Sequence, residues 1–263
     1  MKIAVSGATG RMGKLIIETI LNNDDMELVA AITAPDAPEI GTDAGASLGK
    51  TSGVLISGTT QEIVKADVLI DFTRPEATLT YLPFCVKHDV GIVIGTTGFD
   101  AQGKEKIAEA AKSVPVVFAP NMSIGVNSVL KLLEIAGAML TQYDCEIVEM
   151  HHKHKVDAPS GTALEMGRRV AQGRGVDFDS VAVLSREGHT GERPDGAIGF
   201  AALRGGDVVG DHTVIFAGPG ERIEISHKSG SRAGYAQGAL TAARFLRDKP
   251  NGLFSMSDVL GFN

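Results

Sequence analysis

The chain of 263 residues is 43% apolar and 22% charged, and its formal net charge is −7. The apolar share excludes a disordered protein, and the acidic balance leaves no basic surface for nucleic acid. No apolar run approaches the ~20 residues of a membrane span, and the N-terminal residues do not resemble a signal peptide. We therefore expect a cytoplasmic protein with no nucleic-acid or membrane partner.

The first half of the chain alternates short apolar runs with helical patterns. Strands are expected at residues 2–5, 27–33, 68–73, 91–98 and 114–121, and helices at 12–22, 61–65, 75–88 and 100–113. Residues 34–60 are rich in small and polar residues, which predicts a loop with one short strand. The strands are apolar throughout rather than alternating, which indicates a doubly wound (Rossmann-type) parallel α/β sheet with helices on both faces.

From about residue 123 helices and strands no longer alternate. Helices are expected at residues 126–140, 160–173 and 232–247, and strands at 145–152, 180–185, 197–204, 212–218 and 221–228. Successive strands without helices between them predict a mixed sheet in an α+β domain. We expect a dinucleotide-binding domain of residues 1–122 and a substrate-binding and oligomerisation domain of residues 123–231. The closing residues 232–263 are expected to return to the first domain.

A glycine loop joins the first expected strand to the first helix. Its spacing is GxxGxxG, formed by Gly7, Gly10 and Gly13, rather than the usual GxGxxG. The physical requirements are the same: a tight turn, an unhindered backbone and helix N–H groups directed at a pyrophosphate. Arg11 could add a cation, so the loop predicts dinucleotide binding. The alternative is a purely structural turn between strand and helix.

The second expected strand lacks the acidic residue that selects NAD in many dinucleotide-binding domains. It ends in Thr33 and Ala34, and no carboxylate follows until Asp36. A carboxylate at this point would bind the ribose hydroxyls of NAD, and an arginine would accept the 2′-phosphate of NADP. With neither present, the choice between NADH and NADPH stays open.

The densest group of chemically active residues is the segment HHKHKVDAPSGT at residues 151–162. If the strand continues through it, His151, Lys153 and Lys155 share one face. Ser160 then caps a helix whose amino end, next to several cations, suits a small dicarboxylate. Histidine can deliver a proton near neutral pH. The alternatives are a solvated basic loop and a zinc site, but strand geometry would direct neighbouring histidines to opposite faces. No metal is therefore predicted.

Five stretches of the sequence closely resemble the 4-hydroxy-tetrahydrodipicolinate reductase (dihydrodipicolinate reductase) family. They are GATGRMG (7–13), IDFTRPE (70–76), IGTTGFD (94–100), EMHHKHKVDAPSGTA (149–163) and SREGHTGER (185–193). The resemblance implies reduction of this cyclic dicarboxylate by NADH or NADPH, in diaminopimelate and lysine biosynthesis. It also implies a homotetramer assembled through the sheets of the second domain.

The resemblance also implies residue roles. His151 and Lys155 would be catalytic proton donors, and His152, Gly161 and Thr162 would bind the substrate. The cofactor would be bound by Gly7, Ala8, Thr9, Gly10, Arg11, Met12, Phe72, Thr73, Gly95, Thr96, Thr97, Ala119, Pro120, Asn121 and Met122, with Thr33 and Ala34 at the position that selects between cofactors. Two alternatives are a dinucleotide sensor without catalytic activity and a dehydrogenase of another small dicarboxylate or amino acid.

Overall fold

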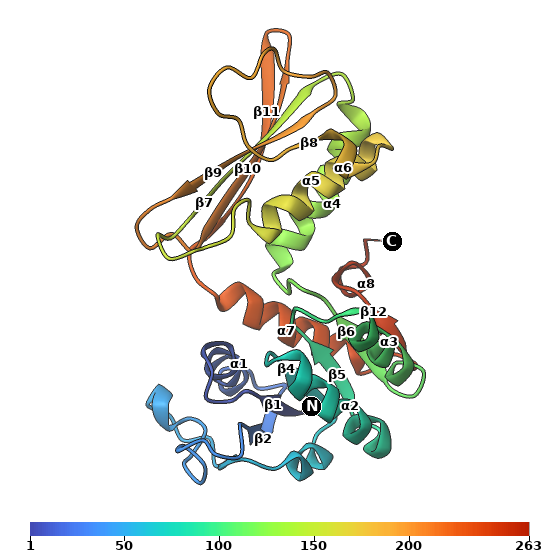
Figure 1. The fold of residues 1–263 in the computed structure, drawn as a ribbon. Helices are drawn as coiled ribbons and strands as arrows, with labels where there is room; N and C mark the ends of the chain where they lie inside the picture. The colour runs from blue at the N-terminus through green and yellow to red at the C-terminus, as the bar shows by residue number, and fades with distance from the viewer. Residues whose placement is uncertain (263) are drawn as a thin grey trace. The chain divides into compact units, whose positions relative to one another are not determined.

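The computed structural model describes residues 1–262 of the chain (Figure 1). Contacts divide the chain into two compact units. The first unit comprises residues 1–124 together with the described residues from 232 onward, and the second comprises residues 125–231. The first unit is therefore discontinuous in sequence. Among the described residues, no helix has both the length and the apolar character needed to cross a bilayer.

The first unit contains a seven-stranded sheet in the order β12-β6-β5-β4-β1-β2-β3. The strands are β1 (Lys2–Ser6), β2 (Glu27–Ile32), β3 (Ile56–Ser57), β4 (Val68–Asp71), β5 (Gly91–Ile94), β6 (Pro115–Phe118) and β12 (Gly252–Phe254). Every neighbouring pair is parallel. This confirms the expected doubly wound sheet. The strand order reverses at β1, so the β1 and β4 carboxyl ends mark its topological switch point.

Two separate apolar cores cover the two faces of this sheet. On one face, Ile3 and Val5 pack with helices α1 (Arg11–Leu21), α7 (Ala233–Leu246) and α8 (Met256–Leu260). On the other, Ala4 and Leu69 pack with α2 (Pro75–His88), α3 (Ala101–Ala110) and the 3₁₀ helix η2 (Thr60–Lys65). A second 3₁₀ helix, η1 (Ala46–Leu48), lies in the long loop after β2. Strands with both faces buried explain the continuous apolar runs.

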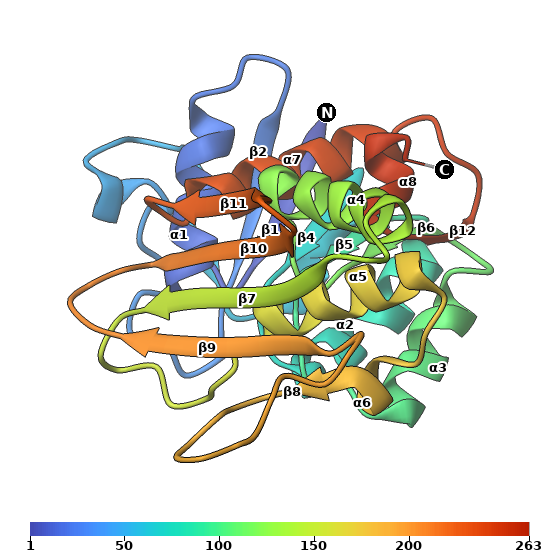
Figure 2. The ribbon, with the colours of Figure 1, turned by 90° about the horizontal axis from the view of Figure 1, so that it is seen from above.

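The second unit contains a five-stranded mixed sheet in the order β11-β10-β7-β9-β8, seen strand by strand in Figure 2. The strands are β7 (Asp144–His151), β8 (Ala182–Val183), β9 (Ile198–Arg204), β10 (Gly210–Gly218) and β11 (Glu221–Ser229). The β7–β9 and β8–β9 pairs are parallel, and β10 is antiparallel to both neighbours. Helices α4 (Ile124–Met139) and α5 (Gly161–Arg174) cover one face of the sheet (Figure 1). The expected mixed sheet is confirmed.

Two features of the structure differ from the expected elements. The strand expected at residues 180–185 is replaced by a short helix, α6 (Phe178–Val181), and only Ala182 and Val183 pair with β9. The Asp177 carboxylate accepts a hydrogen bond from Ser180 N–H, which starts the helix instead. No strand was expected after residue 247, but β12 forms there, parallel to β6. A three-residue strand is too short for its periodicity to be detected.

Candidate active site

The glycine loop between β1 and α1 has the backbone geometry that a phosphate cradle requires. Gly7 has a φ of +64°, and a Cβ on Gly13 would lie 2.0 Å from the Gly7 carbonyl oxygen. Both positions therefore need glycine. Gly10 precedes α1, and no side chain among the described residues caps the helix. The N–H groups of its first turn thus remain available for an anion at the switch point of the sheet.

The loop is joined to the end of β2 by two threonine hydroxyls. The Oγ1 atoms of Thr9 and Thr33 lie 2.8 Å apart, and Ala8 N–H donates to the Ile32 carbonyl at 2.9 Å. Thr33 is buried, whereas Ala34 and Arg11 are exposed and Met12 is half-buried. The pair of hydroxyls occupies the place where an acidic residue would select NAD.

Asp71, at the carboxyl end of β4, organises the loops around it and was not identified from the sequence. Its buried carboxylate accepts hydrogen bonds from Ser6 at 2.5 Å, Thr73 at 2.6 Å and Thr96 at 3.0 Å, and from the Thr78 hydroxyl. Ser6 ends β1, and Thr73 and Thr96 follow β4 and β5. One carboxylate therefore fixes the ends of three neighbouring strands.

The other residues expected to contact a cofactor follow the carboxyl ends of β4, β5 and β6. The Phe72 ring lies so close to Gly95 that a Cβ there would be 2.3 Å from it. Ala119 N–H donates to Ile94 O at 3.1 Å, so the loops after β5 and β6 are also joined. Of the remaining residues, Thr97 and Pro120 are exposed, Asn121 is half-buried and Met122 is buried. The parallel sheet thus brings the expected cofactor residues to one edge.

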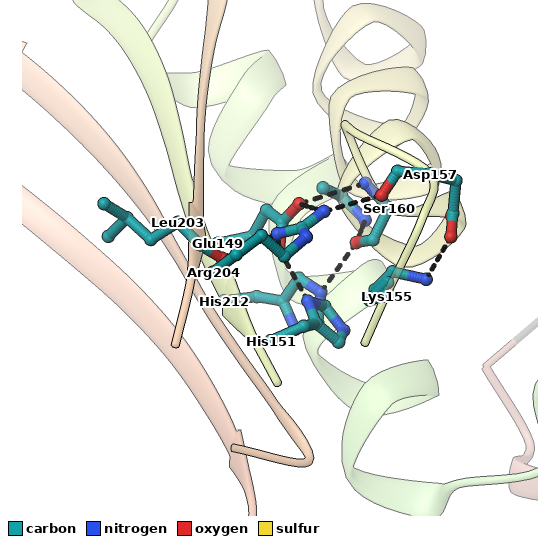
Figure 3. A network of polar contacts seen from close by, with 9 residues as sticks. Glu149, His151, Lys155, Asp157, Ser160, Leu203, Arg204 and His212 are labelled. Atoms are coloured by element: carbon teal, nitrogen blue, oxygen red, sulfur yellow. Dashed lines mark hydrogen bonds and ion pairs between the residues drawn. The ribbon is translucent and has the colours of Figure 1, made fainter. Parts of the chain in front are cut away.

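In the second unit, a network of buried polar side chains surrounds His151, the last residue of β7 (Figure 3). Its Nδ1 atom lies 2.5 Å from Glu149 Oε2. Both Glu149 oxygens also accept hydrogen bonds from the Arg204 guanidinium on β9, each at 2.9 Å. Burial would raise the pKa of Glu149, but the hydrogen bonds from Arg204 and His151 outweigh it and lower the pKa. The Glu149 side chain is therefore an ionised hydrogen-bond acceptor.

The amino end of α5 is attached to the same network through Ser160. Ser160 N–H donates to Glu149 Oε1 at 3.2 Å, its hydroxyl accepts from Ala163 N–H at 3.2 Å, and it lies 3.1 Å from His212 Nε2. Burial, followed by the nearby His151, lowers the pKa of His212 to about 4. His212 is thus neutral near pH 7 and serves as a hydrogen-bond partner.

Lys155 lies in a turn after β7 and not, as had been expected, on the strand. Strand β7 ends at His151, and a turn follows in which Lys155 N–H donates to His152 O at 3.1 Å. The expectation that His151, Lys153 and Lys155 share one strand face was therefore wrong, because the strand stops too early. The half-buried Lys155 side chain donates to Asp157 at 2.8 Å at the edge of the network (Figure 3).

The expected substrate-binding residues flank this network. Gly161 is exposed with open space around its Cα, and Thr162 is half-buried. They are the first residues of α5, so their N–H groups have no partner within the helix. His152 is half-buried, and its buried Nδ1 atom has no hydrogen-bond partner in the described part of the chain. The first N–H groups of α5 are therefore available to an anion.

Three residues of the network have atoms close enough together to ligate a metal ion. Glu149, His151 and His212 offer ligand atoms within 4.8 Å of one another. However, Arg204 already contacts both oxygens of Glu149, and its positive charge would repel a metal cation. We therefore interpret the cluster as a hydrogen-bond network. His152 and His154, which the zinc alternative required, are not part of this group.

The dinucleotide-type sheet of the first unit and the buried polar network of the second indicate a two-domain oxidoreductase. Family models for the N-terminus and the C-terminus of dihydrodipicolinate reductase match residues 1–122 and 125–260, respectively. The chain belongs to the dihydrodipicolinate reductase family.

Named relatives align with almost the full length of the chain. The chain is 60% identical to 4-hydroxy-tetrahydrodipicolinate reductase of Cupriavidus metallidurans, covering 99% of both chains. It is 58% identical to the reductase of Herminiimonas arsenicoxydans, covering 99% of this chain and 98% of that protein. Among solved structures, a dipicolinate-bound dihydrodipicolinate reductase from Paenisporosarcina sp. TG-14 matches with a TM-score of 0.77 and 26% identity, covering 97% of both chains.

Replacing Asp71 with alanine should lower the free energy of unfolding by about 3 kcal/mol, because four hydroxyls, three of them on buried residues, lose their acceptor. Urea unfolding followed by circular dichroism measures the loss. Asp67→Ala is the control, since that carboxylate accepts only an exposed hydrogen bond from Lys2 N–H in the described chain. A loss no larger than the control's would contradict the role given to Asp71.

Proposed function

We propose that the chain catalyses the reduction of 4-hydroxy-tetrahydrodipicolinate to tetrahydrodipicolinate by NADH or NADPH, a cytoplasmic step of diaminopimelate and lysine biosynthesis. The relatives that carry this activity in their names align over the whole chain. The observation that carries the proposal is a buried histidine, fixed through Nδ1, in one network with an open helix N-terminus. A sensor without catalytic activity would not require this network.

The first unit fits a nicotinamide dinucleotide. The steric need for glycine at Gly7 and Gly13, and the uncapped start of α1, match what a pyrophosphate requires. Phe72 and Thr73 after β4, and Gly95 to Thr97 after β5, would bind the part of the cofactor nearer the nicotinamide. When bound, reduced nicotinamide supplies the hydride, and the protein supplies orientation and charge.

The second unit would bind and protonate the substrate. The N–H groups of Gly161 and Thr162, at the start of α5, would hold a carboxylate together with His152. After loss of water the substrate ring contains a conjugated C=N system. Hydride addition at ring carbon four pushes an electron pair to the ring nitrogen, which then takes a proton. His151 and Lys155 would supply that proton and stabilise the developing negative charge.

Replacing the two proposed proton donors should abolish most turnover. We expect His151→Gln and Lys155→Met each to lower kcat by about 100-fold or more, since each removes a general acid. Cofactor affinity should persist because both residues belong to the second unit. The measurement is the loss of NAD(P)H absorbance with freshly made product of dihydrodipicolinate synthase.

Lys153→Met is the matched control, because Lys153 is an exposed cation in the same turn. Its activity should stay close to that of the unmodified chain. Full activity of either the His151 or the Lys155 variant would remove that residue from the mechanism. No oxidation of either cofactor by the unmodified chain would overturn the proposed reaction.

We propose that the enzyme uses NADH and NADPH with similar efficiency. The Thr9–Thr33 hydroxyl pair supplies no carboxylate to repel a 2′-phosphate, and Ala34 supplies no cation to bind one. The two kcat/KM values should lie within about tenfold of each other, or roughly 1.4 kcal/mol. Ala34→Arg should favour NADPH and Ala34→Asp should favour NADH. Steady-state kinetics would contradict the proposal if both variants shifted the ratio in the same direction.

We propose a homotetramer assembled through the sheet of the second unit. Helices α4 and α5 cover one face of this sheet, and apolar side chains on the opposite face include Val148, Leu203 and Ile215. Light scattering should give four times the 27.5 kDa mass of one chain. Leu203→Asp should lower that mass by burying a charge, whereas Val176→Asp, outside the sheet, should not. A monomeric unmodified chain would exclude the tetramer.

A further inference from the structure

Glu149 is a buried acidic side chain to which the reaction described above assigns no role. We propose that Glu149 is a positioning residue that holds the His151 ring with Nε2 as its proton-donating atom, while Arg204 shares the charge of the carboxylate with the ring. The inference rests on the proposed function, because it concerns how His151 performs its part of the reaction.

Contacts on both oxygens fix the position of the Glu149 carboxylate. The side chain is 1% exposed on β7, two residues before His151, so both point to the same face of the sheet. Oε2 contacts His151 Nδ1 at 2.5 Å, and Oε1 accepts from Ser160 N–H at 3.2 Å. The same carboxylate therefore fixes the ring of the proposed acid and the start of the helix proposed to bind substrate.

This contact decides which nitrogen of His151 exchanges a proton. An ionised carboxylate can only accept hydrogen bonds, so Nδ1 must carry a hydrogen in both the neutral and the charged ring. Proton donation to substrate is then left to Nε2. A Cβ on Gly210 would lie 3.0 Å from Nε2, so glycine at this position keeps the atom unobstructed.

Arg204 is held as firmly as the carboxylate it contacts. Besides the two bonds to Glu149, its guanidinium donates to the carbonyl oxygens of Asp157 at 2.6 Å and Leu203 at 2.7 Å. Its positive charge opposes that of a protonated His151 ring. Removing the Glu149 charge would therefore take an attractive charge away from an imidazolium, and removing the Arg204 charge would take a repulsive one away.

The other ionisable groups near His151 are either neutral or paired with each other. His212 on β10 lies with its ring centroid 5.0 Å from that of His151, and burial keeps it neutral near pH 7. Lys155 and Asp157, in the turn after β7, form an ion pair with each other at 2.8 Å. Within the described residues, Glu149 is therefore the carboxylate in direct contact with the ring.

The test is the pH dependence of kcat/KM in two variants with opposite expected shifts. A general acid loses activity as pH rises, because its proton is lost. Glu149→Gln, which is isosteric but uncharged, should move this alkaline fall to lower pH by about one unit. It should also lower kcat by about tenfold or more, with a smaller change in the substrate KM. Arg204→Met, which leaves the carboxylate to His151 alone, should move the fall to higher pH.

Two conservative variants separate this role from general support of the fold. Glu149→Asp and Arg204→Lys keep the charges, so each should restore the position of the alkaline fall even where stability suffers. Dipicolinate affinity, measured by calorimetry, should remain measurable in Glu149→Gln. Unchanged profiles, or shifts in the same direction for Glu149→Gln and Arg204→Met, would overturn the inference. An unmodified chain with no activity would instead overturn the proposed function.

Discussion

The organisation of the second unit depends on the ion pair between Glu149 and Arg204. An ionised carboxylate taken out of water must have all its lone pairs satisfied, or its burial becomes prohibitively unfavourable. Here its partners come from β9 and from the start of α5, 55 and 11 residues away in the chain, as well as from His151 on its own strand. Satisfying one charge thus brings a strand, a helix terminus and an imidazole into fixed relative positions.

In the first unit, hydroxyl groups rather than a guanidinium surround the buried carboxyl group. Asp71 is fully buried, and four hydroxyl groups donate hydrogen bonds to it. Because each hydroxyl belongs to a short side chain at or near a strand end, the carboxylate keeps the neighbouring loops close together. In both units, therefore, a carboxylate at or near the end of a strand orders the surrounding residues, with arginine as the partner in one case and serine and threonine in the other.

The sequence predicts much of this architecture because its signals are local. Apolar runs identify the parallel strands, and the spacing of Gly7, Gly10 and Gly13 identifies the loop after β1. The contacts of Glu149 with Arg204 could not be predicted in this way, since they depend on the parallel pairing of β7 with β9. The predicted placement of Lys155 on the strand face was wrong because a local signal, strand periodicity, was extended past His151, where a turn begins.

The discontinuity of the first unit affects the order in which the molecule can be made. Helix α7 contributes Ala236, Ala239 and Leu240 to the core on one face of the parallel sheet, and β12 forms its edge. These residues leave the ribosome after residues 125–231, which form a continuous unit that is complete earlier. Since domains generally fold as units during synthesis, the later unit in sequence can fold first. Until α7 has been translated, the core that the amino-terminal strands form with α1 then remains incomplete.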